Sequence, residues 1–253
     1  VGMSAFSGSA SPLATVVIGA GQAGLSASGY LVRSGLHPLQ DFVVLDANDG
    51  PGGAWRHRWA SLTLGAAHAV HDLPGFPLGS PDPHEPASAV VARYYGDYER
   101  ALSLPVIRPV HVAAVTSRPE GLLEVRAGEN AWVTRTLINA TGTWDKPWWP
   151  SYPGRASFRG RQLHTHDFVD AAQFAGQSVV VVGGGLSAVQ FLLQLAAAGA
   201  RTTWVTRRPP DWTDRPFDPA WGRAVEESVR DRTRQGLPPL SVVAATGIPL
   251  IPE

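Results

Sequence analysis

The chain of 253 residues carries 21 basic and 21 acidic side chains, so its formal net charge is zero. This balance excludes a basic face for nucleic acid and a polybasic segment for a membrane surface. No apolar stretch approaches the roughly 20 residues that a membrane-spanning helix needs. Cysteine is absent, which excludes disulfides, thiolate nucleophiles and cysteine metal ligands. The composition therefore predicts a soluble cytoplasmic protein of one large or two modest domains.

The first predicted unit is a strand, a glycine-rich turn and a helix, followed by a second strand. A buried strand over residues 14–18 leads into the sequence GAGQAG at residues 19–24, and a helix over residues 22–34 follows. The second strand, over residues 42–45, ends at Asp46. In a dinucleotide-binding βαβ unit an acid at this point binds the ribose hydroxyls, about 20 residues after the last glycine. This unit therefore predicts a dinucleotide without a 2′-phosphate.

A long loop, a helix and a β-meander are predicted for the middle of the chain. The helix over residues 86–102 begins at Pro86 and carries Asp97 and Glu99 on its polar side, where neither needs a special role. A short strand follows, and after it come the strands of the meander. The short strand is expected over residues 106–107, and the meander strands over residues 110–117, 122–126 and 131–136. Residues 137–140 then lead into Thr141-Gly142.

A second unit of the same kind begins with a run of valines. It continues with the sequence GGGLSA at residues 183–188 and a helix over residues 186–198. The next strand, over residues 202–206, ends at Arg207 and Arg208. Arginine at this point accommodates the 2′-phosphate of a nicotinamide dinucleotide. The two units together therefore suggest FAD at the first and NADPH at the second.

Four further motifs are GGAW at residues 52–55, ATG at 140–142, FxGxxxHxxxF at 158–168 and VTRRP at 205–209. With these motifs the chain resembles the bacterial flavin-containing monooxygenase-like proteins of the two-dinucleotide-binding flavoprotein superfamily. The resemblance runs from about residue 13 to the end of the sequence. It implies that GGAW lies beside the flavin and that His164 has a structural role in the interdomain linker.

The resemblance implies an α/β fold with two Rossmann-like dinucleotide-binding domains, the NADPH domain being inserted in the FAD domain, and with a β-meander in the FAD domain. It assigns residues 1–146 to the FAD domain and residues 147–253 to the NADPH domain. After Arg208 come a Pro-rich stretch, one charged helix over residues 218–235 and residues 241–253. The segment that returns to the FAD domain is therefore expected to be missing, and a longer chain or a partner subunit would supply it.

The expected site residues bind cofactors, no metal site is expected, and no catalytic side chain is named. In the first domain the expected cofactor-binding residues are Gly19, Gly21, Gln22, Ala23, Gly24, Asp46, Gly53, Trp55, Val112, Thr141 and Gly142. In the second domain they are Gly183, Gly185, Leu186, Ser187, Ala188, Arg207 and Arg208.

The implied activity is that of a FAD-dependent monooxygenase, which uses NADPH and dioxygen and transfers oxygen from a flavin hydroperoxide to a small molecule. Ala60 and Ser61 stand where Baeyer–Villiger relatives have an aromatic residue and a proline, and Phe168 stands where they have tryptophan. These departures favour a soft nucleophile, a sulfide or an amine, over a ketone. Gly65 stands where eukaryotic relatives have asparagine, which leaves the substrate pocket undefined.

Two alternatives stay open at this point. One is an NADPH-dependent flavin oxidase or reductase that releases peroxide. The other is a truncated member that binds nucleotide without turnover. A homodimer is compatible with the sequence, and no nucleic acid or membrane partner is expected.

Overall fold

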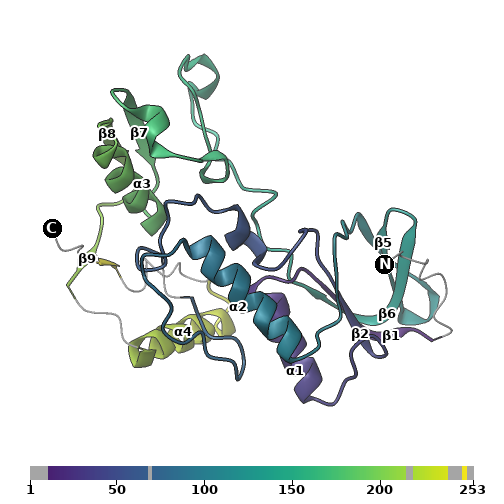
Figure 1. Cartoon of the computed structure of the whole chain (residues 1–253). Helices are drawn as coiled ribbons and strands as arrows, with labels where there is room; N and C mark the ends of the chain where they lie inside the picture. The colour runs from purple at the N-terminus through teal and green to yellow at the C-terminus, as the bar shows by residue number, and fades with distance from the viewer. Residues whose placement is uncertain (1–10, 68–69, 215–218, 239–246, 250–253) are drawn as a thin grey trace. The chain divides into compact units, whose positions relative to one another are not determined.

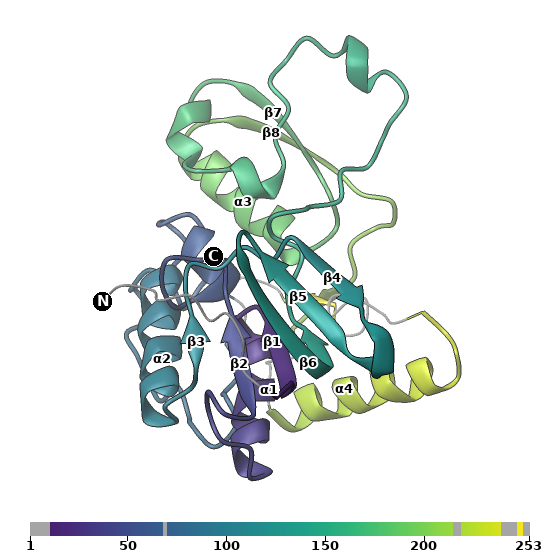
Figure 2. The ribbon, with the colours of Figure 1, turned by 90° about the vertical axis from the view of Figure 1, so that its right-hand side faces the viewer.

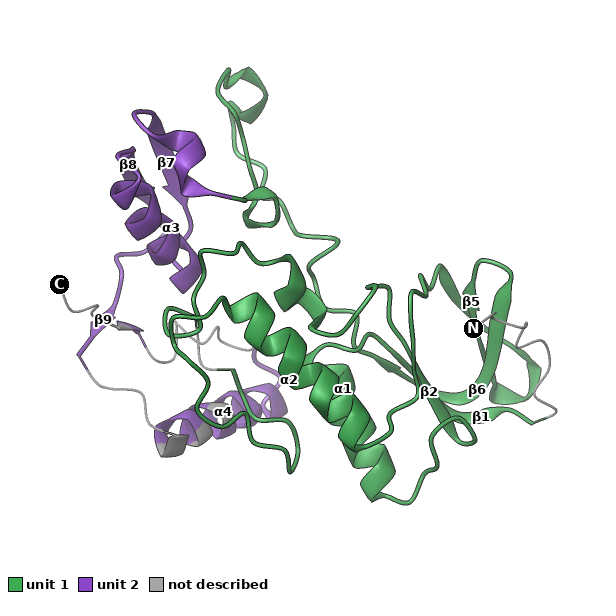
Figure 3. Cartoon of the chain, in the orientation of Figure 1, with its two compact units in different colours: residues 1–169 green, residues 170–253 purple. Residues whose placement is uncertain are grey.

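The computed structural model describes residues 11–67, 70–214, 219–238 and 247–249. The chain divides into two compact units, Val1–Val169 and Asp170–Glu253 (Figure 3). Within the described ranges, no helix is both long enough and apolar enough to cross a membrane. The domain boundary expected after residue 146 and the insertion of one domain in the other stay predictions.

The first unit is built on a six-stranded sheet. Its strands are β1 (Leu13–Ile18), β2 (Phe42–Leu45), β3 (Val106–Ile107), β4 (Ala114–Ser117), β5 (Leu123–Ala127) and β6 (Asn130–Asn139). Their order across the sheet is β3-β2-β1-β6-β5-β4 (Figure 2). Strands β1, β2, β3 and β6 run parallel, whereas β4, β5 and β6 form an antiparallel meander. Strand β6 therefore joins the two parts, because it pairs with β1 on one side and with β5 on the other.

Both faces of the parallel strands β1 and β2 are buried. On one face, Val17 belongs to an apolar cluster that includes side chains of α1 (Gln22–Arg33) and α2 (Ala87–Ala101). On the other face, Val16 belongs to a cluster that includes Val125 of the meander. Burial on both faces is the reason why these strands appear in the sequence as continuous apolar runs.

The meander differs from its prediction at both ends. Residues 110–113 form no strand, because the Val110 N–H donates to the carbonyl oxygen of Asp46 at 2.8 Å and so follows the end of β2. Strand β6 is longer than expected, since residues 131–136 and 137–140 belong almost entirely to one continuous strand. The other predicted elements of this unit agree with the structure within about two residues. Its short 3-10 helices are η1 (Gly53–His57), η2 (Pro119–Gly121), η3 (Arg155–Ser157) and η4 (Thr165–Asp167).

The second unit contains a βαβ element (Figure 1). Its elements are η5 (Ala171–Phe174), β7 (Ser178–Val182), α3 (Leu186–Ala197), β8 (Arg201–Val205), β9 (Trp212–Thr213), α4 (Pro219–Arg234) and β10 (Ile248–Pro249). Strand β7 pairs in parallel with β8, and β9 pairs in parallel with β10. Helix α4 is the expected charged helix, although Asp218 and most of residues 241–253 lie outside the described residues. The α/β class with a β-meander is thus confirmed.

Candidate dinucleotide-binding sites

The first glycine fingerprint is a tight turn between β1 and α1 in which two glycines have no room for a side chain. Gly19 has a φ of +101°, and a Cβ there would lie 2.4 Å from the carbonyl oxygen of Ala140. A Cβ on Gly24 would lie 1.8 Å from the carbonyl oxygen of Gly19. The two glycines therefore let α1 and the end of β6 approach β1 closely, as a dinucleotide-binding turn requires.

The GGAW loop rests directly on this turn. Gly53 has a φ of +52°, and a Cβ there would lie 2.8 Å from the Cα of Gly21. By contrast, a Cβ on Gly21 would meet no atom closer than the Cα of Gly53 at 4.0 Å. Gly21 is also the N-cap residue of α1. The chain thus leaves space beside the N-terminus of a helix, which is where a pyrophosphate binds in this kind of unit.

Gln22 is held by two partners that the sequence did not indicate. The Tyr95 hydroxyl donates to Gln22 Oε1 at 2.5 Å, and Gln22 Nε2 donates to the carbonyl oxygen of His71 at 3.1 Å. Tyr95 is fully buried on α2, and this burial raises the pKa of its hydroxyl well above the usual range. The hydroxyl therefore keeps its proton and fixes the first turn of α1, on which Ala23 is exposed.

Asp46 follows β2 as predicted, and the structure adds a partner for its carboxylate. Arg108 Nε donates to Asp46 Oδ2 at 2.8 Å, while Arg108 Nη1 and Nη2 donate to the two oxygens of Glu99 at 2.7 and 2.6 Å. The side chains of Arg108, Asp46 and Glu99 are only 11, 6 and 13% exposed. The prediction that Glu99 has no special role on the polar side of its helix was therefore wrong.

The buried Asp46–Arg108–Glu99 triad carries a net charge of −1 when all three groups are ionised. Burial opposes the charge on Arg108, but its hydrogen bonds to Glu99 and Asp46 raise its pKa above the usual range. Asp46 Oδ1 has a longer contact, 3.4 Å, with Asn48 Nδ2. This oxygen therefore keeps the capacity to accept a hydrogen bond from a ribose hydroxyl.

Thr141 and Gly142 follow β6 at the edge of the sheet where β1 ends. The Thr141 N–H and hydroxyl both donate to Asn139 Oδ1, at 3.3 and 2.9 Å, and Gly142 has a φ of +64°. Both residues are exposed. Val112 has a different setting, because it packs against the apolar cluster that β2 shares with the meander.

The second fingerprint forms a similar turn between β7 and α3, with more space around it. Gly183 has a φ of +144°, and apart from chain neighbours no heavy atom lies within 4 Å of a Cβ built on Gly183 or Gly185. The Gly183 N–H donates to the carbonyl oxygen of Val205 at 2.9 Å. The Trp204 indole Nε1 donates to the carbonyl oxygen of Gly183 at 2.6 Å. Trp204 is thus a second side chain that fixes a fingerprint and that the sequence did not indicate.

The remaining predicted residues of the second unit lie around this turn. Leu186, Ser187 and Ala188 form the first turn of α3, and Ala188 is buried in the place of the third glycine. Arg207 and Arg208 follow β8 and are exposed. Neither forms an ion pair with any residue in the described part of the chain. Their positive charge is therefore available to a phosphate group.

The FxGxxxHxxxF motif at residues 158–168 has a structural role in the first unit. His164 Nδ1 accepts a hydrogen bond from the His166 N–H at 3.1 Å, and Asp167 Oδ2 accepts one from the His164 N–H at 3.3 Å. These bonds cap η4 reciprocally. Phe168, the last residue of the motif, packs edge-on against Trp59 with 5.5 Å between ring centres. The motif thus holds the chain after β6 in a defined turn.

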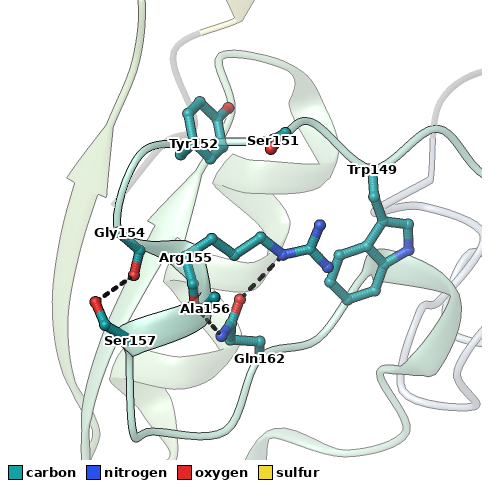
Figure 4. A pocket seen from close by; sticks show the side chains of 8 residues that line it. All are labelled: Trp149, Ser151, Tyr152, Gly154, Arg155, Ala156, Ser157 and Gln162. Atoms are coloured by element: carbon teal, nitrogen blue, oxygen red, sulfur yellow. Dashed lines mark hydrogen bonds between the residues drawn. The ribbon is translucent and has the colours of Figure 1, made fainter.

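A shallow hollow lies earlier in the same linker (Figure 4). The Arg155 guanidinium lies 4.6 Å from the ring centre of Trp149, and its Nε donates to Gln162 Oε1 at 3.3 Å. Gln162 Nε2 in turn donates to the carbonyl oxygen of Arg155 at 2.9 Å. The hollow is lined by Trp149, Ser151, Tyr152, Gly154, Arg155, Ala156, Ser157 and Gln162. It is separate from the residues of both fingerprints.

Comparison with known proteins agrees with this geometry. The family described as pyridine nucleotide-disulphide oxidoreductase matches residues 16–236. A flavin-containing monooxygenase from Stenotrophomonas maltophilia is 37% identical with a TM-score of 0.74, and the alignment covers 94% of this chain and 70% of that one. A mutant flavin monooxygenase of the same organism is 39% identical with a TM-score of 0.76, over 89% and 68% of the two chains. The chain belongs to the pyridine nucleotide-disulphide oxidoreductase family, among its flavin-containing monooxygenases.

Curated relatives of this family extend beyond the chain. The uncharacterized oxidoreductase CzcO of Bacillus velezensis is 31% identical over 72% of this chain and 51% of its own length. The trimethylamine monooxygenase of Pelagibacter ubique is 28% identical over 76% of this chain and 50% of its own length. The chain thus spans about half the length of the curated relatives that it matches. The 253 residues contain no cysteine, so they supply no dithiol for disulfide exchange.

Proposed function

We propose that this chain binds FAD at the first fingerprint and NADPH at the second, and that the two cofactors serve a monooxygenase reaction on a small molecule. The observation that carries the proposal is the contact between Gly53 and Gly21. Through this contact the GGAW loop, which resembles the loop beside the flavin in flavin-containing monooxygenases, lies against the turn where a dinucleotide pyrophosphate would bind.

The residues of the first unit fit FAD. Gly21 leaves the space that a Cβ would fill, and α1 presents its N-terminus to that space. Asp46 has one oxygen left for a ribose hydroxyl, since Arg108 occupies the other. Thr141 and Gly142 lie at the same edge of the sheet, where α/β folds bind their ligands. In this proposal Trp55, half-buried after the GGAW glycines, lies beside the flavin ring.

The residues of the second unit fit NADPH. Gly183 and Gly185 leave open space at the N-terminus of α3. The Trp204 indole fixes this turn through its hydrogen bond to the carbonyl oxygen of Gly183. Arg207 and Arg208 provide two exposed guanidinium groups for the 2′-phosphate. We therefore expect a preference for NADPH over NADH.

The cofactors supply the redox chemistry, hydride transfer and oxygen activation, when they are bound. The chain's own contribution is to hold both dinucleotides, to orient the flavin through the GGAW loop and to limit the access of water to it. We propose a sulfide or an amine as the group that receives oxygen. Ala60 and Ser61 replace the aromatic residue and proline of ketone-oxidising relatives, and the trimethylamine monooxygenase relative acts on an amine. A cytoplasmic location and a homodimer stay predictions.

The natural full-length protein, reconstituted with FAD, tests this proposal. We expect a stoichiometric flavin absorbance spectrum, bleaching of that spectrum by NADPH, and NADPH oxidation that methyl phenyl sulfide or trimethylamine accelerates. Product and hydrogen peroxide are measured against the NADPH consumed. If the amount of hydrogen peroxide formed equals the amount of NADPH consumed, the oxidase alternative is correct. If no flavin binds, the assignment of the first unit is wrong.

A further inference from the structure

Arg58 lies among three tryptophans in the first unit. Its guanidinium carbon is 4.9 Å from the ring centre of Trp144, 5.8 Å from that of Trp59 and 5.9 Å from that of Trp55. We call these three rings the tryptophan cage. Trp59 is buried, and Arg58, Trp55 and Trp144 are half-buried. The cage therefore holds a positive charge that is partly removed from water.

Arg58 has no acidic partner among the described residues. Burial alone lowers its pKa, and no described carboxylate counteracts this effect. Arg108 by contrast has three hydrogen bonds to two carboxylates, and these raise its pKa. Aromatic rings attract a guanidinium, but they accept none of the in-plane hydrogen bonds that its five N–H groups can donate. An anionic group at Arg58 would supply the missing acceptors.

The cage lies at the ligand-binding edge of the sheet. Trp55 and Arg58 belong to the segment that begins at Gly53, and Gly53 rests on Gly21. Trp144 follows β6, whose end pairs in parallel with the end of β1 through Asn139 and Ile18. Both segments of the cage therefore leave the carboxyl ends of parallel strands, where open α/β sheets bind their substrates and cofactors.

The anion at Arg58 differs from the phosphates of the two dinucleotides. A pyrophosphate at the first fingerprint has the space at Gly21 and the N-terminus of α1, and the 2′-phosphate of NADPH has Arg207 and Arg208 in the second unit. A group that binds in the tryptophan cage has apolar walls of indole on several sides. Such walls suit a planar carboxylate with an apolar body better than a phosphate, which remains strongly hydrated.

We propose that Arg58 and the tryptophan cage bind the carboxylate of a small organic acid that carries an apolar group, and that this acid is the substrate of the monooxygenase. This inference rests on the proposed function for the identity of the reaction. Binding itself is independent of the reaction. The guanidinium donates two parallel hydrogen bonds to the carboxylate, and the indole rings contact the apolar body.

A matched pair of ligands tests the inference, with isothermal titration calorimetry on the FAD-loaded protein. (Phenylthio)acetate carries a carboxylate, a sulfide and an aromatic ring, and (phenylthio)acetamide differs from it only in having a neutral carboxamide in place of the carboxylate. We expect the acid to bind at least about tenfold more tightly than the amide, the difference that one charge-assisted hydrogen bond gives. Arg58→Met should abolish this preference and Arg58→Lys should retain part of it. Arg135→Met removes the same charge from an exposed position of β6 and should leave the preference intact.

Several outcomes overturn the inference. They are equal affinities of acid and amide, an absence of acid binding, and a preference that survives in Arg58→Met with its flavin content unchanged. Displacement of the acid by inorganic phosphate at lower concentration would identify the ligand as a phosphate and would also contradict the proposal. Equal oxidation of acid and amide would overturn the role of Arg58 and leave the proposed function standing. Selective binding of the acid without any NADPH-dependent oxidation would support the binding role of Arg58 and contradict the proposed function.

Discussion

The two βαβ units of this chain share a fingerprint and differ in how tightly their glycines are packed. In the first unit, β1 and β2 are buried, and a Cβ on Gly19 or Gly24 would overlap a backbone carbonyl oxygen. In the second unit, β7 and β8 are largely exposed, and a Cβ on Gly183 or Gly185 has space around it. The charged residues that follow the second strands differ in the same way, since Asp46 is buried and paired whereas the two arginines are exposed. The first position of the fingerprint is therefore closely packed in the first unit and open in the second, whereas the second position, Gly21 or Gly185, has space in both units.

The largest expected effect concerns the third position of the fingerprint. Gly24→Ala should destabilise the first unit by roughly 4 kcal/mol or more, because its Cβ would overlap the carbonyl oxygen of Gly19. The reverse change at the equivalent position, Ala188→Gly, should cost only about 1 kcal/mol through lost helix propensity. Differential scanning calorimetry of both variants compares the two costs. Equal losses would show that the units do not differ as described.

The buried triad gives the next largest effect. Arg108→Met should destabilise the protein by about 3–5 kcal/mol, because it leaves Asp46 and Glu99 buried without their cation. Arg93 pairs with Glu85 at the surface, so Arg93→Met, the matched control, should cost at most about 1 kcal/mol. Urea titration followed by circular dichroism measures both values. A small loss in Arg108→Met would mean that the triad contributes no more than a surface pair.

A substitution at Gly21 should affect FAD binding without affecting folding. A Cβ at Gly21 has space in the protein alone, so Gly21→Val should fold but bind FAD about 10–100-fold more weakly through overlap with the pyrophosphate. Gly185→Val should weaken NADPH binding in the same way and leave FAD binding unchanged. Flavin fluorescence and NADPH titration measure the two affinities. Full flavin occupancy in Gly21→Val would contradict the assignment of FAD to this turn.

The exposed arginines of the second unit should affect cofactor choice and little else. Changing Arg207 and Arg208 together to glutamine should raise the KM for NADPH about tenfold or more, while the KM for NADH and the thermal stability change little. Steady-state kinetics with both cofactors provide the measurement. Equal use of NADPH and NADH by the unaltered protein would refute the role of these residues.

The smallest effect concerns the meander, which belongs to the first unit only. Glu124 contacts Arg126 and Arg118, and the hydrogen bond from Arg126, followed by the charge of Arg118, lowers the pKa of this carboxyl. Because the folded pKa lies below the unfolded one, Glu124 stabilises the fold above about pH 4.3, and this contribution is lost as the pH falls. Glu124→Gln should therefore flatten the fall of Tm between pH 5 and pH 3. An unchanged slope would exclude this contribution.

The sequence predicted those parts of the fold and site that depend on local order. Strand β1, helix α1 and strand β2 follow from apolar runs and from the GAGQAG turn. Gly21 and Gly53 were both predicted as cofactor-binding residues. The sequence did not predict that Arg108 binds Asp46, because the two residues lie 62 positions apart and nothing local connects them. Glu99 looked like a solvent-facing residue for the same reason. The bonds of Tyr95 to Gln22 and of Trp204 to Gly183 likewise depend on tertiary packing.

The position of β6 has a consequence for biosynthesis. Val16 of β1 pairs with Val43 on one side and with Leu137, far along the chain, on the other. During translation, β1 therefore has a second neighbour only after the chain has been made as far as Leu137. Until then one edge of β1 displays unpaired N–H and C=O groups that another chain can bind. Closing this long loop also slows the pairing. The interval between the synthesis of β2 and that of β6 is thus the period in which a nascent chain of this protein most needs protection by chaperones.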